Sequence, residues 1–125
     1  MKNLLTLKKN YDFQKVLKKG KWYGSNLLNV YIMKNNKNSN FIGIAVGKKV
    51  SKSSVRRNRI RRIIKEAYRL NEKNIASGLD IIMVWKTNCS YELANFYSIQ
   101  ENLLYCFKKA NLLNVEENTK EDNNV

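Results

Sequence analysis

The sequence of 125 residues contains 24 lysine and arginine residues against 10 aspartate and glutamate residues, so its formal net charge is +14. The length fits a single domain with a hydrophobic core, and a charge of this size indicates a polyanionic partner. The chain has no histidine, and its two cysteines, Cys89 and Cys106, form no CxxC motif. These features argue against a metal site, against a histidine base, and hence against a self-sufficient hydrolase.

The first half of the chain predicts a helix followed by strands. Asn10 can cap a short helix that ends at Gly20 and carries apolar side chains along one face. The apolar and aromatic segments 26–34 and 41–50 predict two strands, and the polar, asparagine-rich segment between them predicts that they pair as a hairpin. A shorter strand at 21–24 is only weakly indicated.

The second half predicts a helix, a strand and a further helix. Ser53 or Ser54 can cap a basic helix that ends at about Leu70. The continuous apolar run DIIMVW at 80–85 is typical of a strand that is buried on both faces. A last helix follows Ser90, with apolar residues near helical spacing.

The two ends of the chain carry little structural signal. The N-terminal apolar stretch is too short for a signal peptide, and no apolar run is long enough to span a membrane, so we expect a cytoplasmic protein. Residues 116–125, EENTKEDNNV, are acidic and polar, which predicts a disordered tail. Residues 1–115 are expected to form one domain without an internal repeat.

This order of elements predicts an α/β or α+β domain, a two-layer sandwich in which helices cover one small sheet. The strands at 41–50 and 80–85 flank the basic helix and could form a parallel unit with it. The usual hand of such a connection is right-handed.

The basic helix, SSVRRNRIRRIIKEAYR at 53–69, has two distinct sides. On a helical wheel an apolar stripe faces the sheet, and it consists of Ile60, Ile63, Ile64, Ala67 and Tyr68. About a third of the circumference is polar and almost wholly cationic, with Asn58, Arg61, Arg62, Lys65 and Arg69. A solvated surface is the usual explanation for a charge run, but such a surface mixes signs. Because arginine grips phosphate bidentately and first-turn N–H groups attract anions, we interpret this helix as binding nucleic acid.

Three segments together resemble the bacterial ribonuclease P protein subunit. RRNRIRRIIKEAYR is similar to the RNR signature of that family, LKKNYDFQKVLKKGK to its first helix, and GIAVGKK at 43–49 to the strand and Lys-Lys pattern before the signature. The match runs in order from about Leu7 to Lys109. The resemblance implies an αβββαβα fold, ribosomal protein S5 domain 2-like, with an unusual left-handed crossover around the basic helix instead of the right-handed default.

The resemblance also implies a function for this RNA-binding domain. Family members help a catalytic RNA to remove the 5′ leader of precursor tRNA, and the RNA performs the hydrolysis with Mg²⁺ ions. The chain would then be an enzyme only as a subunit of the holoenzyme, with the catalytic RNA and precursor tRNA as partners. It would have no catalytic residue, metal or cofactor of its own, and no obligate protein partner or membrane partner. The scattered acids Asp12, Glu66 and Asp80 are then expected to be structural.

Two binding surfaces follow from the resemblance, in which the RNR motif matches Arg57, Asn58 and Arg59. The residues expected to contact the catalytic RNA are Lys48, Lys49, Arg56, Arg57, Asn58, Arg59, Arg61, Arg62, Lys65 and Arg69. A cleft between the first helix and the sheet is expected to hold the single-stranded leader through Phe13, Leu17 and Tyr31, because bases stack on aromatic rings. Leu17 stands where many members have a second aromatic residue.

Core packing is the alternative explanation for the two rings of the cleft. Phe13 shares a helix face with apolar neighbours, which leaves its position open. Strand alternation, by contrast, places Tyr31 on the face opposite that of its two apolar neighbours, which favours the cleft. Trp22 and Tyr23 could also stack on bases, but the sequence does not place them.

Two other functions are compatible with the charge. A basic RNA-binding protein of ribosomal type, with no processing role, would share the general fold but would need no leader cleft. A DNA-binding module would read the major groove with its arginine helix, yet the sequence offers no helix-turn-helix partner.

Overall fold

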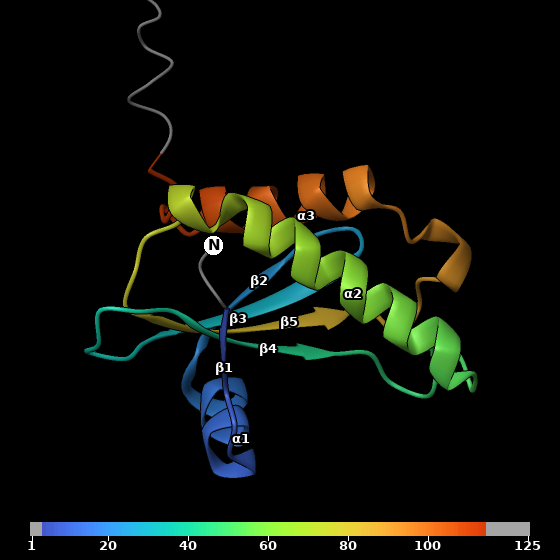
Figure 1. The fold of residues 1–125 in the computed structure, drawn as a ribbon, viewed down its shortest axis with the longest axis horizontal. Coiled ribbons are helices and arrows are strands. Elements are labelled where there is room, and N and C mark those ends of the chain that lie inside the picture. Colours follow the sequence, from blue (N-terminus) through green and yellow to red (C-terminus); the bar gives the residue numbers. More distant parts are fainter. Residues whose placement is uncertain (1–3, 115–125) are drawn as a thin grey trace, which may run out of the picture.

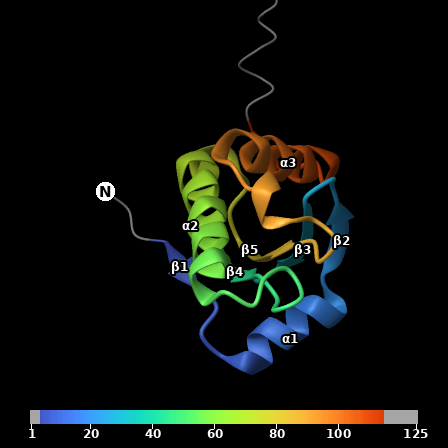
Figure 2. The same cartoon turned by 90° about the vertical axis from the view of Figure 1, so that its right-hand side faces the viewer.

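The computed structural model describes residues 4–114, which form a five-stranded sheet and three α-helices, and the tail predicted at 116–125 lies outside the described residues. The strand order across the sheet is β1-β4-β5-β3-β2. α2 and α3 cover one face of the sheet, and α1 crosses the other face (Figure 1, Figure 2). The elements are β1 (Leu5–Thr6), α1 (Asn10–Lys19), β2 (Lys21–Gly24), β3 (Leu28–Lys34), β4 (Phe41–Ala45), α2 (Ser54–Asn71), β5 (Leu79–Trp85) and α3 (Phe96–Lys109). The mixed α/β class and the αβββαβα order are confirmed, with the two-residue strand β1 added before them.

The connection from β4 through α2 to β5 has an unusual hand. β4 and β5 are parallel neighbours in the sheet. Figure 2 looks along these strands from their C-terminal ends, with β4 to the left of β5 and α2 above the sheet. A chain that rises from β4 to α2 and then descends to β5 on the right turns in the left-handed sense, against the usual rule. The left-handed crossover is therefore confirmed, and the right-handed default is wrong for this chain.

The hairpin predicted around residues 35–40 does not form, because β5 lies between β3 and β4. Asn40 is buried in this connection, and its Nδ2 donates to the Tyr68 hydroxyl (3.0 Å) and to the Ala76 carbonyl (2.9 Å). Its Oδ1 accepts from the N–H of Leu79 at 2.9 Å. These hydrogen bonds carry the loop across the beginning of β5, so β4 enters the sheet on the far side of that strand. β3 pairs instead with β2 and β5.

The basic helix begins where the sequence predicts. The Ser53 side chain accepts a hydrogen bond from the N–H of Arg56 (3.3 Å), which satisfies one of the free N–H groups of the first turn. The helix ends at Asn71. The prediction for α1 is wrong at its start, because Lys9 rather than Asn10 occupies the N-cap position and makes no side-chain cap.

The last helix begins later than predicted. Ser90 is followed by a short 3₁₀ turn, Tyr91–Leu93, and not by α3. Asn95 caps α3, since its Oδ1 accepts from the N–H of Ser98 at 3.0 Å. A second 3₁₀ turn, Glu72–Asn74, follows α2 on the way to β5.

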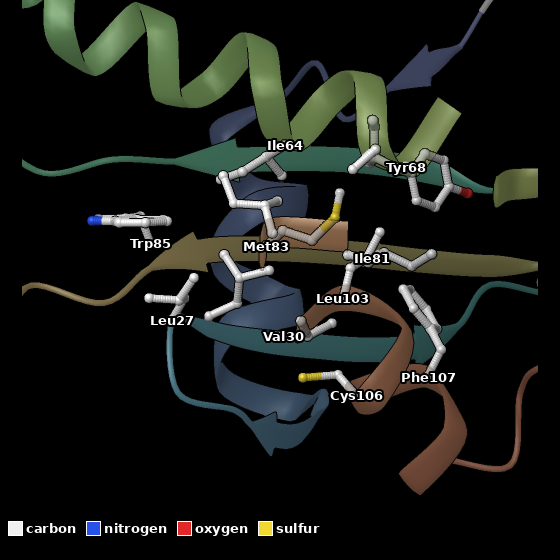
Figure 3. Close-up of a cluster of buried hydrophobic side chains, with 14 of the residues drawn as sticks. Leu27, Val30, Ile64, Tyr68, Ile81, Met83, Trp85, Leu103, Cys106 and Phe107 are labelled. Carbon is white, nitrogen blue, oxygen red and sulfur yellow. The ribbon is translucent and has the colours of Figure 1, made fainter. Parts of the chain in front are cut away.

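The hydrophobic core lies between the sheet and the layer of α2 and α3 (Figure 3). Trp85, Tyr68 and Phe107 are the largest fully buried side chains. Ile81 and its alternate neighbours on β5 point into this core, whereas Ile82, also fully buried, points toward α1. The prediction that this strand is buried on both faces is therefore confirmed at Ile82, whereas Asp80 and Val84 on the same face are only partly buried.

The two cysteines are part of this packing. Cys89 and Cys106 are both buried and unpaired. Burial raises the pKa of the Cys106 thiol, which keeps the less nucleophilic form present at neutral pH. Within residues 4–114, no helix is both long enough and apolar enough to cross a membrane.

Candidate nucleic-acid interface

The N-terminal end of α2 is a concentrated positive site. The first turn of the helix contains no acidic residue. Lys48 and Lys49 lie in the exposed turn between β4 and α2. Because the helix macrodipole is also positive at this end, both the helix terminus and the lysines that precede it along the chain favour an anion.

Arg57, the first arginine of the RNR motif, holds this turn together. Its Nη1 donates to the carbonyl oxygens of Ser51 (2.9 Å) and Lys52 (3.1 Å). The residue is only partly exposed, unlike its neighbours in the first turn. Arg57 therefore shapes the approach to α2 as well as adding charge to it.

Two arginines lie on the side of α2 that faces the 3₁₀ turn before α3. The Arg56 guanidinium lies 4.8 Å from the ring centre of Tyr91, and its Nη1 is 3.8 Å from Oε2 of Glu92. Arg59 lies 5.6 Å from the same ring and donates to the Ala94 carbonyl at 3.3 Å. Tyr91 thus orients both guanidinium groups, a role that the sequence does not signal, because the turn packs against α2 only in the fold.

Three further cations of α2 lie on the opposite side, above the edge of β4. Arg61 donates through Nη1 to Oδ1 of Asn58 (2.6 Å) and through Nη2 to the carbonyl of Val46 (3.4 Å), which fixes its guanidinium beside the strand. A pocket of about 380 Å³, called the basic pocket below, is lined by Thr6, Leu7, Phe13, Ile42, Gly43, Ile44, Arg61, Arg62 and Lys65. It joins the basic side of α2 to the aromatic ring of α1.

The basic pocket exists because the edge of β4 is left open. β1 pairs only with Phe41 and Ile42, so within residues 4–114 the later part of β4 has no strand on this side. Phe13 packs at this edge against Gly43, where an added Cβ would lie only 2.7 Å from Cε2 of the ring. Glycine at this position therefore permits the ring to approach the backbone closely. Phe13 is half-buried, so its ring both packs against the sheet and remains accessible in the pocket.

Arg69 does not belong to this group. It lies at the C-terminal end of α2, where its Nε and Nη2 donate to the two carboxylate oxygens of Glu66 at 3.0 and 2.6 Å. These hydrogen bonds lower the pKa of Glu66 and raise that of Arg69. Arg69 lines a separate pocket of about 560 Å³ beside Asn40 and Glu72.

The remaining residues of the expected leader cleft lie on the face of the sheet that α1 crosses. Val30 and Ile32 are buried in the core, whereas Tyr31 between them is partly exposed on the opposite face, so the alternation argument is confirmed. Tyr31 does not line the basic pocket. It lies on β3, and β5 separates this strand from β4, where Phe13 packs. Leu17 of α1 is partly buried. The cleft residues therefore share one face of the sheet without converging on one point.

The acidic side chains of the described region do not form a metal site. Within residues 4–114 no three His, Cys, Asp or Glu side chains are grouped so that they could hold a metal ion. Asp80 accepts a hydrogen bond from Asn35 Nδ2 at 3.0 Å, and Glu66 is paired with Arg69. Both acids are therefore engaged with polar side chains of the domain.

Comparisons with known proteins agree with this geometry. The family model for Ribonuclease P matches residues 1–111. The ribonuclease P protein component of Alkaliphilus oremlandii is 42% identical over 114 residues, which cover 91% of this chain and 97% of that protein. The corresponding protein of Natranaerobius thermophilus is 37% identical over 113 residues, with 90% and 96% covered.

Solved structures give the same result. The Staphylococcus aureus RNase P protein superposes with a TM-score of 0.76 at 30% identity, covering 90% of this chain and all of that one. The Thermotoga maritima RNase P protein gives a TM-score of 0.75 at 29% identity, covering 83% of this chain and 96% of that one. The chain therefore belongs to the bacterial ribonuclease P protein family, which supplies the protein subunit of the tRNA 5′-processing holoenzyme whose RNA carries out the catalysis.

Proposed function

We propose that the cations of the basic pocket and the adjoining side of α2 contact the catalytic RNA, and that Phe13 in the pocket and Tyr31 beyond it hold the 5′ leader of precursor tRNA. The observation that carries this proposal is the convergence of three cations and one aromatic ring in a single pocket, namely Arg61, Arg62, Lys65 and Phe13. The cations suit backbone phosphates, and the ring suits an unpaired base beside them.

Cations and aromatic rings would have different roles in this proposal. Cationic side chains that neutralise phosphates release counterions, so binding to the catalytic RNA should weaken steeply with salt. Stacking on Phe13 and Tyr31 would hold the leader with little regard to its sequence, as an enzyme acting on many precursors requires. The hydrolysis relies on Mg²⁺ ions held by the RNA. The protein positions the leader and strengthens binding of the precursor relative to the mature tRNA.

The second basic side of α2 extends the RNA contact in this proposal. Arg56 and Arg59 are exposed and held by Tyr91 in fixed orientations, with Lys48 and Lys49 nearby on the chain. Fixed guanidinium groups lose less side-chain freedom when they bind phosphate. A cytoplasmic location, where precursor tRNA would be met, goes with this function as an expectation. The comparisons give no support for the ribosomal alternative.

The experiment that tests the function is cleavage of precursor tRNA at low Mg²⁺ concentration by a bacterial ribonuclease P RNA, with and without this protein. We expect strong stimulation, with the cut at the mature 5′ end. Binding to the same RNA and to duplex DNA, measured over a series of salt concentrations, is the control for non-specific charge attraction. Absence of stimulation together with equal affinity for both nucleic acids would overturn the proposal.

A further inference from the structure

We propose that the leader runs from the basic pocket past Tyr31 to Trp22, with its 5′ end farthest from the pocket, and that Trp22 stacks on an unpaired leader nucleotide beyond the one at Tyr31. The inference rests on the proposed function, because it adds one position to the same cleft. It assigns a role to a ring that the sequence could not place. The occupant we infer is a nucleobase of single-stranded RNA.

The strand register sets Trp22 next to Tyr31. β2 and β3 are antiparallel, and Trp22 lies directly opposite Tyr31 in the pairing. Tyr23, the next residue, packs against the hydrophobic core, so Trp22 points to the face that α1 crosses. The two rings therefore lie on neighbouring strands of one face, about 5 Å apart in strand spacing. Since β2 is at the sheet edge farthest from β4, Trp22 lies farther from the basic pocket than Tyr31 does.

The Trp22 ring is exposed and held in place. It is 57% exposed, although tryptophan is usually covered in a folded protein. Its Nε1 donates to Oδ1 of Asn29 at 3.0 Å. One part of the ring lies over Gly24, where an added Cβ would be 2.6 Å from the indole Cζ2. A fixed aromatic surface that is partly free is what a stacking base needs, because little side-chain freedom remains to be lost on binding.

The surroundings of Trp22 offer groups for both the bases and the phosphates of RNA. A hollow of about 690 Å³ begins at Trp22 and reaches α3, and it is lined by Trp22, Gly24, Ser25, Asn26, Lys86, Glu101, Asn102 and Tyr105. Tyr105 is 51% exposed, and the Lys109 ammonium lies 5.2 Å from its ring centre. The hollow combines two exposed rings with Lys86 and two asparagine amides, which suits the bases and phosphates of a single strand, and it also holds one carboxylate, Glu101.

A purely structural explanation competes with this inference. A large ring that covers a glycine on an edge strand can stabilise the strand, and Trp22 covers Gly24 in this way. This explanation predicts that removal of the ring lowers the free energy of unfolding and affects all RNA partners alike. Stacking on the leader predicts instead an effect that depends on leader length.

The test measures affinity of the reconstituted holoenzyme for precursor tRNAs whose leaders are shortened one nucleotide at a time from the 5′ end, with mature tRNA as reference. We expect Trp22→Ala to weaken binding of long-leader precursors about fivefold or more. As the leader is shortened, the effect of Trp22→Ala should disappear first, while Tyr31→Ala still weakens binding. Trp22→Phe retains a ring and should retain most of the affinity. Tyr97→Ala is the matched control, because Tyr97 is 79% exposed on α3, across the sheet from the cleft.

The outcomes separate the possible failures. If Tyr31→Ala shows a leader effect and Trp22→Ala shows none at any length, the role of Trp22 is overturned and the proposed function stands. If Trp22→Ala weakens mature tRNA and all precursors equally, the ring acts through folding or assembly, which also overturns it. If neither variant changes the affinity for precursor relative to mature tRNA, the proposed leader cleft is wrong.

Tryptophan fluorescence tests the inference without a substitution. Trp85 is fully buried, so a ligand that quenches tryptophan emission acts on Trp22. Quenching by single-stranded oligoadenylate would support stacking on Trp22, and unchanged emission would contradict it.

Discussion

The two faces of the sheet differ in how completely they are covered. On one face α2 and α3 form a continuous layer, and the strand residues beneath it, such as Val30 and Met83, are fully buried (Figure 3). On the other face α1 is the single covering helix in the described region, and Tyr31 and Val84 remain partly exposed. The apolar area that stabilises the fold is therefore concentrated on one face, and the other keeps surface free for binding.

This difference means that stability and leader recognition should respond to different substitutions. Side chains of the α2–α3 layer are expected to control unfolding. Side chains of the α1 face and of the edge of β4 are expected to control RNA contacts while the fold persists. α2 takes part in both, since its apolar stripe packs on the sheet and its basic sides point outward.

The largest effect is expected in the covered face. Phe107→Ala removes a fully buried ring that packs near Tyr68, with ring centres 6.5 Å apart. We expect a loss of about 3–5 kcal/mol in the free energy of unfolding, measured by urea titration. Under conditions where the variant is still folded, its preference for precursor over mature tRNA should be unchanged. A selective loss of that preference would show that the two faces are not independent.

The next effect tests the basic pocket. Arg62 is exposed and makes no hydrogen bond or ion pair within residues 4–114. Arg62→Ala should therefore leave unfolding unchanged but weaken assembly with the catalytic RNA by about 1–3 kcal/mol. The slope of log binding constant against log salt concentration should also become shallower by about one unit. Arg62→Lys, which keeps the charge and loses the planar fork, should recover only part of the affinity, and full recovery would indicate a purely electrostatic contact.

A smaller effect is expected from the open face. Tyr31→Ala should leave assembly with the catalytic RNA unaffected and reduce the affinity for leader-bearing precursor by about 1 kcal/mol, the low end of a base-stacking contact, because the ring is already partly covered. The measurement compares precursor and mature tRNA binding to the same holoenzyme. If Tyr31→Ala and Arg62→Ala gave the same pattern, the separation of a leader face from an RNA-assembly side would be wrong.

The smallest effect is expected at the exposed ion pair of α2. Arg69 lowers the pKa of Glu66, so the ion pair can stabilise the fold at pH values above the ordinary carboxyl pKa. This contribution is lost as the pH falls through the lowered pKa, where Glu66 becomes protonated. Both side chains are solvent-accessible, so we expect Glu66→Gln to leave unfolding by urea unchanged at neutral and at acid pH. A marked loss of stability at neutral pH alone would show that the pair does more than its exposure suggests.

The sequence was sufficient for local features. The apolar stripe of α2, its serine cap and the buried strand β5 all follow from periodicity and capping chemistry, which act over a few residues. The outward position of Tyr31 follows from alternation alone. The pairing of Glu66 with Arg69, three positions apart on one helix, is also a local feature, although a helical wheel alone assigns Arg69 to the cationic side.

Non-local features could not be obtained in this way. The order of β3, β5 and β4 depends on hydrogen bonds from Asn40 to residues about thirty to forty positions later, and no turn rule anticipates them. The meeting of Phe13 with the basic side of α2 depends on how far β1 extends along β4. The place of Trp22 depends on the register between β2 and β3.

The strand order also bears on how the chain assembles as it is synthesised. β5 is the central strand, and it pairs with both β3 and β4, although each of these is made well before it. Until β5 leaves the ribosome, those two strands lack their shared partner and the apolar stripe of α2 has no finished surface to cover. The sheet can therefore close only after β5 has been synthesised, so the basic segment that forms α2 is made before the core beneath it can be completed.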